Sequence, residues 1–121
     1  MEVTSLDNGL QLDFNWLQIR HKIKDVMKLE KLPDVNAILL FIGVQELGRW
    51  KSHKFKKEEK QDLMHIAVCI LLSGEGYYEW DGLDTEGWPH FKKLKEFDLK
   101  GQEYQEQYLK EKIIQYFHEK N

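Results

Sequence analysis

The chain has one cysteine in 121 residues and none of the compact motifs that mark common catalytic sites. Cys69 cannot form an internal disulfide, which is typical of proteins from a reducing compartment. Because it lies in the apolar stretch Leu63 to Leu72, we expect a core residue rather than a reactive thiol. No segment matches a phosphate loop, a zinc site, a nucleophile elbow or a dinucleotide-binding motif. The sequence therefore gives no motif-based evidence for any of these catalytic or binding functions.

The sequence also shows neither a membrane span nor a secretion signal. Its most apolar stretch, Leu63 to Leu72, is about half of the ~20 residues that a helix needs to cross a bilayer. Residues 1–14 contain no basic segment followed by an apolar one, so we expect no secretory signal. We therefore expect a cytoplasmic protein with no membrane partner.

Composition and charge indicate one ordinary globular domain. The hydrophobic content is 41% and there are four tryptophans, which suits a single core in a chain of 121 residues. The 18 Lys and Arg nearly balance the 21 Asp and Glu, and the formal net charge is −3. This balance provides no overall attraction to nucleic acid, so we do not expect a nucleic-acid partner.

The first half of the chain predicts an amphipathic helix within residues 1–31 and a helical pair within residues 32–76. Pro33 should end the first helix, and Asp34 should cap a second one over residues 35–47, with Gly48 at its C-terminus. A third helix should begin near Glu58 and Glu59 and continue through the apolar stretch. The inward stripe expected for the first helix comprises Leu12, Trp16, Ile19, Ile23, Val26 and Met27.

The second half changes from a helical to an alternating pattern. Tyr78 and Trp80 alternate with acidic residues, which predicts a β-hairpin within residues 77–94, with strands near 77–82 and 88–94. Gly87 should close its turn in a left-handed conformation, and Pro89 indicates an edge strand. A last amphipathic helix is expected within residues 101–119. The predicted fold class is therefore α+β and mainly helical, about four helices packed with a β-hairpin in one domain spanning residues 1–121.

Several segments resemble an uncharacterised family of small proteins from Bacteroidetes-type bacteria. The strings that carry the resemblance are LPDVNAILLFIGVQELG, KKEEKQDLMHIAVCILLS, GYYE and GWPHF. They cover roughly residues 29–117. The resemblance implies no activity, substrate, cofactor or catalytic residue.

One candidate site lies on the expected third helix. Glu58, Asp62, His65 and Cys69 are spaced by four, three and four residues, so they share one side of a helix. A carboxylate and a histidine three residues apart can hold iron, manganese or zinc, and Glu46 could join Asp62 and His65 in such a site. Helical metal sites of this kind use two such pairs, however, and only one is present. A solvated helix turn explains the same residues, so we expect no metal and no cofactor.

A second candidate is the acidic and aromatic hairpin. Tyr78, Trp80, Trp88 and His90 could form a binding surface, and the nearby carboxylates could support hydrolysis with His90. The aromatic residues could equally be the half of the hairpin that packs on the helices. A solvent-facing Trp80 or Trp88 would favour a partner or ligand site.

A third candidate is the basic segment 49–60. Its cations could follow the phosphates of a single-stranded nucleic acid while aromatic residues stack on bases, but Glu58 and Glu59 dilute its charge. The cations of this alternative are Arg49, Lys51, Lys54, Lys56 and Lys57.

The function predicted from the sequence is a non-enzymatic binding or protein-interaction module. The first alternative is a metal- or carboxylate-assisted hydrolase with Glu58, Asp62, His65 and His90 as catalytic candidates. The second is single-stranded nucleic-acid binding through residues 49–60. Because the hairpin ends in an edge strand, a homodimer formed by strand pairing is a further expectation.

Overall fold

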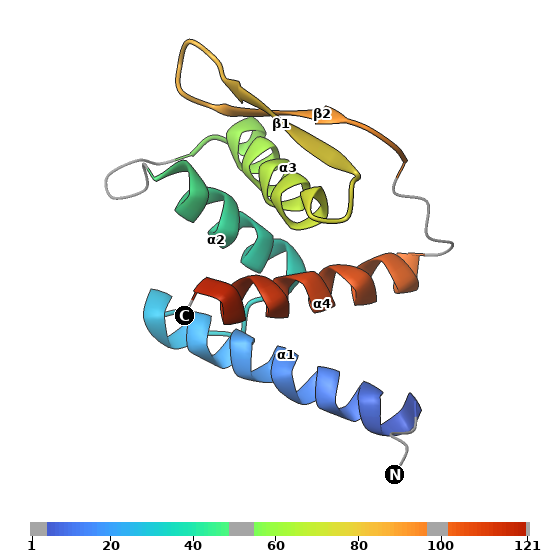
Figure 1. The fold of residues 1–121 in the computed structure, drawn as a ribbon. Coiled ribbons are helices and arrows are strands. Elements are labelled where there is room, and N and C mark those ends of the chain that lie inside the picture. Colours follow the sequence, from blue (N-terminus) through green and yellow to red (C-terminus); the bar gives the residue numbers. More distant parts are fainter. Residues whose placement is uncertain (1–4, 49–54, 97–101, 121) are drawn as a thin grey trace.

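The computed structural model describes residues 5–48, 55–96 and 102–120, and it is a mainly helical α+β fold (Figure 1). This confirms the fold class predicted from the sequence. The elements in chain order are α1 (Ser5–Met27), α2 (Val35–Leu47), α3 (Lys57–Ser73), β1 (Tyr78–Leu83), β2 (Pro89–Lys93) and α4 (Gln102–Lys120). None of the helices in these described segments is long and apolar enough to span a membrane.

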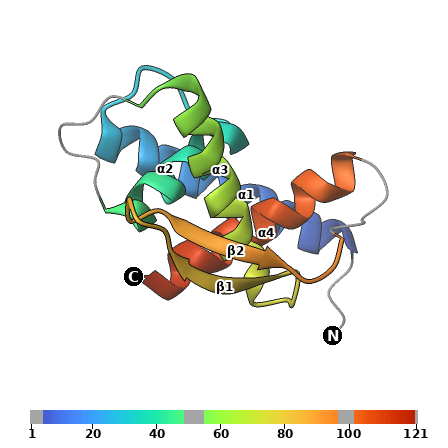
Figure 2. The same ribbon diagram turned by 90° about the horizontal axis from the view of Figure 1, so that it is seen from above.

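The elements stack in layers with the hairpin at one end and α1 at the other (Figure 1). The β1–β2 hairpin lies across α3, which also packs against α2 and α4 (Figure 2). α1 packs against α4 as the outermost helix. The core that joins the helical layers includes Trp16, Ile38, Ile42, Ala67 and Ile113.

α2 is capped at its two ends by Asp34 and Gly48, as the sequence predicted. Asp34 accepts a hydrogen bond from the Ala37 backbone N–H at 2.9 Å, and Gly48 adopts a left-handed φ of 76° while its N–H donates to the Val44 carbonyl. The predicted bounds 35–47 are therefore confirmed.

α2 and α3 approach each other closely at Gly43. A Cβ atom built on this buried glycine would lie 2.2 Å from the carbonyl oxygen of Leu63. Only a residue without a side chain fits there. Ile38 and Ile42 of α2 belong to the same buried core as Ala67 of α3.

α1 ends earlier than predicted, at Met27 rather than near Pro33. Lys28 takes a left-handed φ of 54°, and the Leu29 N–H donates to the Lys24 carbonyl at 2.9 Å, which closes the helix. Val26 and Met27, predicted to face the core, are instead exposed. The prediction was wrong for these two residues because the core-facing stripe ends with the buried Ile23.

The hairpin is antiparallel and carries a bulge that the sequence analysis did not predict. Trp80 pairs with Phe91, but the next pair is Leu83 with Pro89, so β1 contains one extra residue. Gly82 occupies the irregular part with a φ of 91°. Trp80 and Leu83 are three residues apart, so in a regular strand they would lie on opposite faces. The extra residue places both on the same face of the hairpin.

Candidate functional site

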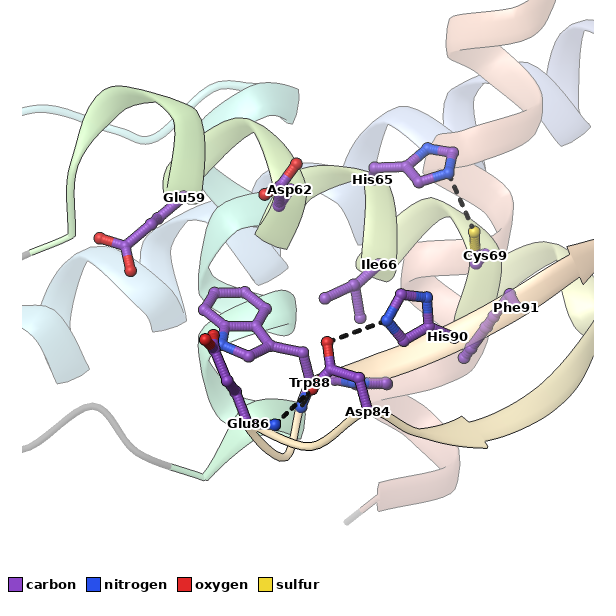
Figure 3. Close-up of a pocket in the computed structure, with 11 residues that line it drawn as sticks. Glu59, Asp62, His65, Ile66, Cys69, Asp84, Glu86, Trp88, His90 and Phe91 are labelled. Carbon is purple, nitrogen blue, oxygen red and sulfur yellow. Dashed lines mark hydrogen bonds and ion pairs between the residues drawn. The ribbon is translucent and has the colours of Figure 1, made fainter.

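A groove of about 440 Å³ lies between α3 and the hairpin (Figure 3). We call it the α3–hairpin groove. It is lined by Glu59, Asp62, His65, Ile66 and Cys69 from α3, and by Asp84, Glu86, Trp88, Pro89, His90 and Phe91 from the hairpin. Four carboxylates and two histidines line it, and among the described residues that line it there is no lysine or arginine.

The hairpin side of the groove is organised by Asp84. Its Oδ1 accepts hydrogen bonds from the backbone N–H groups of Glu86 and Trp88, both at 2.9 Å. The turn is closed further by the Gly87 N–H, which donates to the Asp84 carbonyl at 3.0 Å, and Gly87 has the predicted left-handed φ, 86°. A short aspartate at the first turn position therefore fixes where Glu86 and Trp88 leave the backbone.

The other carboxylate oxygen of Asp84 holds His90. Its Oδ2 lies 3.0 Å from Nε2 of His90, and both side chains remain well hydrated. The hydrogen bond with His90 is the main cause that lowers the pKa of Asp84, and the N–H groups of Trp88 and Glu86 lower it further. One carboxylate thus fixes the turn through one oxygen and orients an imidazole through the other.

The α3 side of the groove contains a histidine–cysteine contact. Nε2 of His65 lies 3.5 Å from Sγ of Cys69, and the His65 ring meets the Tyr78 ring edge-on at 6.0 Å. Burial raises the pKa of the Cys69 thiol to about 11, so the thiol is protonated at neutral pH. Cys69 is buried, as predicted. The protonated thiol is a weaker nucleophile than the thiolate.

The structure brings together parts of two candidate sites that the sequence analysis kept separate. Asp62 and His65 of α3 line the same groove as Trp88 and His90 of the hairpin (Figure 3). Glu58 does not line it, whereas its neighbour Glu59 does. Glu59 also accepts a hydrogen bond from the Lys56 backbone N–H at 2.8 Å at the start of α3. Sequence spacing alone favoured Glu58, since it lies four residues before Asp62.

The alternative metal site of Glu46, Asp62 and His65 is not assembled. Glu46 is outside the groove lining, and its Oε2 accepts a hydrogen bond from the Tyr116 hydroxyl at 2.5 Å. Burial is the main cause that raises the pKa of Tyr116, and the bond to Glu46 adds to it. In the described part of the chain, no group of three or more His, Cys, Asp and Glu residues could hold a metal ion.

The aromatic residues of the hairpin divide between two surfaces. Trp88 lines the α3–hairpin groove and Tyr78 is half-buried beside His65. Trp80 is 57% exposed and meets Phe91 edge-on at 5.7 Å. Together with the exposed Leu83 it borders a second hollow of about 370 Å³. The bulge places these two residues on the same face. In the sequence, Gly82 is the only sign of this bulge.

The basic segment falls largely outside the described residues. Arg49, Lys51 and Lys54 lie in the range 49–54, which is not described, while Lys56 and Lys57 are exposed at the start of α3. The nucleic-acid alternative therefore stays a prediction.

Comparisons with known proteins returned no match to a family model, to a curated protein or to a solved structure. The resemblance to the Bacteroidetes-type family also stays a prediction.

Proposed function

We propose that the protein is a non-enzymatic, cytoplasmic interaction module that binds a lysine or arginine side chain of a partner protein in the α3–hairpin groove. The observation that carries this proposal is the lining itself, where Glu59, Asp62, Asp84 and Glu86 line the same groove as the indole of Trp88 (Figure 3). Carboxylates pair with a cationic head group, and an aromatic face attracts the same cation. The described lining contains no lysine or arginine, so a cationic side chain would meet no like charge of that kind in the groove.

The shape of the groove suits a side chain presented by a peptide. Ile66 and Phe91 provide apolar surface for the methylene stem of lysine or arginine, while Asp62, Asp84 and Glu86 are exposed. The carboxylates are hydrated, so each contributes modestly and the complex should be weak and sensitive to salt. The single buried cysteine fits a cytoplasmic location.

The direct test measures binding of short lysine- or arginine-containing peptides by calorimetry. Glu59→Gln should weaken binding by about two- to fivefold, since one exposed ion pair is lost. Glu58→Gln is the matched control, because it removes the same charge from the adjacent residue outside the groove. Trp88→Ala should weaken binding further. Equal effects of Glu59→Gln and Glu58→Gln, or no binding of cationic peptides at low salt, would reject the proposal.

A second candidate function rests on the Asp84–His90 pair. An imidazole held by a carboxylate can act as a general base toward water, so a carboxylate-assisted hydrolase remains the alternative. Burial raises the pKa of the Cys69 thiol, so this thiol is not an activated nucleophile. Hydrolysis of simple activated esters at a rate that His90→Ala abolishes would favour this alternative over the binding module.

A further inference from the structure

The α3–hairpin groove contains two histidines among its carboxylates. His65 belongs to α3 and His90 to β2, and both line the groove (Figure 3). Both residues are exposed, so protons reach them directly from the solvent. Histidine is the side chain that ordinarily changes its charge between about pH 5 and pH 8. The charge inside the groove should therefore change in this pH range.

The other ionisable groups around the two histidines keep their charge over the same range. Carboxylates ordinarily stay ionised above about pH 5, and lysines stay protonated. His65 contacts two neutral groups, which are the ring of Tyr78 and the thiol of Cys69, whose pKa burial raises to about 11. The fixed charges are those of the lining residues Glu59, Asp62, Asp84 and Glu86 and of the strand residues Glu79, Asp81, Lys92 and Lys93.

His90 is held by one of the carboxylates that line the groove. The pKa of Asp84 lies below its ordinary value, so this carboxylate is ionised at neutral pH and only accepts hydrogen bonds. Nε2–H of His90 therefore donates to Oδ2 of Asp84, at 3.0 Å. A further proton would be taken up at Nδ1, and the resulting imidazolium would be a cation paired with Asp84. A lysine or arginine of a partner would then meet a like charge in the groove.

From this geometry we infer that the α3–hairpin groove is sensitive to pH: it holds a cationic side chain near pH 8 and releases it toward pH 5.5, because His90 and His65 become competing cations. This inference rests on the proposed function of the groove. The lining contains four carboxylates and two histidines, so protonation of both histidines would halve its net negative charge. By linkage, a partner that prefers the unprotonated groove must also expel protons when it binds.

The expected effect is moderate, because the groups are exposed. One exposed charge changes an affinity by about two- to fivefold, so the two histidines together should raise the dissociation constant about four- to tenfold between about pH 8 and pH 5.5. His90 should contribute more than His65, since its protonated form also occupies Asp84. The fold should persist, because protonation strengthens the hydrogen bond between Asp84 and His90.

The first test measures binding of an arginine-containing peptide by calorimetry at about pH 8 and pH 5.5, at one low ionic strength. The peptide is acetylated, amidated and free of other ionisable side chains, so its charge stays constant. The dissociation constant should rise about four- to tenfold for the unaltered protein, about two- to threefold for His90→Gln, and less than about twofold for the double variant His65→Gln/His90→Gln. Glutamine retains an N–H that can donate to Asp84.

His21→Gln is the matched control for this test. His21 is an exposed histidine of α1, which lies at the opposite end of the molecule from the hairpin (Figure 1). This variant should keep the full pH dependence of the unaltered protein. It also reveals any effect of the charge that the whole protein gains on acidification. Circular dichroism at both pH values should confirm that each variant folds.

The outcomes distinguish this inference from the proposed function. No binding at about pH 8 and low salt would reject the proposed function and the inference with it. Binding that is equally strong at both pH values would overturn the inference and leave the proposed function standing. The inference also fails if the double variant keeps the full pH dependence, or if His21→Gln reduces it as much as His90→Gln does.

The second test detects the protons expelled on binding. The unaltered protein is titrated with the same peptide near pH 6.5, where histidine ordinarily changes its charge, in two buffers of different ionisation enthalpy. The measured heats should differ, because the buffer takes up the expelled protons. The double variant His65→Gln/His90→Gln should show a smaller difference. Equal heats in both buffers for the unaltered protein would overturn the inference.

Discussion

Replacing Gly43 with alanine should destabilise the protein, although alanine is the better helix former. The new Cβ would lie 2.2 Å from the carbonyl oxygen and 2.7 Å from the carbonyl carbon of Leu63. Both are backbone atoms, so no side-chain rotation relieves the contact, and α2 must move away from α3 by about 1 Å to reach ordinary contact distance. The shift loosens the packing around Ile42, which is fully buried.

The expected magnitude combines two opposing effects. Overpacking of a tight helix contact costs about 3 kcal/mol, near the upper end of the usual range, because the whole helix must shift. The higher helix propensity of alanine offsets about 1 kcal/mol of this cost. The net loss in the free energy of unfolding is then about 2 kcal/mol, which lowers Tm by about 5–10 °C for a domain of this size.

Gly9→Ala provides the matched control, since Gly9 is also a glycine inside a helix. No atom lies within 4 Å of the position its Cβ would take. The same substitution should therefore stabilise the protein by roughly 0.5–1 kcal/mol. Thermal unfolding of both variants, followed by circular dichroism, compares them directly. A Gly43→Ala variant as stable as the unaltered protein would show that α2 and α3 do not meet as described.

Two further predictions concern the end of α1 and the groove. Lys28→Gly should stabilise the protein by about 0.5–1 kcal/mol in chemical unfolding, because Lys28 has a left-handed φ of 54° that glycine adopts without strain; Lys24→Gly, inside the helix, should destabilise it by about 1 kcal/mol. His90→Ala should raise the pKa of Asp84 toward its ordinary value, as measured by NMR of the Asp84 carboxyl. In the unaltered protein the lowered pKa means that ionised Asp84 favours the folded state above about pH 4, and this contribution disappears as the pH falls through the folded-state pKa. The variant should lose less stability on acidification, and an unchanged Asp84 pKa would show that the hydrogen bond to His90 does not form in solution.

Most of the fold could be predicted from local sequence because the relevant signals are local. Asp34 and Gly48 fix the ends of α2 through bonds within a few residues, and Gly87 marks the hairpin turn. The end of α1 could not be predicted, because a lysine rather than a glycine takes the left-handed conformation.

The candidate site could be predicted only in pieces. Asp62 and His65 were recognised by helical spacing, and Trp88 and His90 by the composition of the hairpin. The two pairs line one groove because the hairpin packs across α3. The local sequence of neither segment indicates this tertiary arrangement. The choice of Glu59 over Glu58 depends on the rotation of α3 by one residue, about 100°, which spacing leaves undetermined.

The hairpin and α1 lie at opposite ends of the molecule (Figure 1). A short segment held in the α3–hairpin groove would therefore leave α1 uncovered. With one such groove per copy, a partner that carries two cationic segments would gain no avidity from a single copy of the protein.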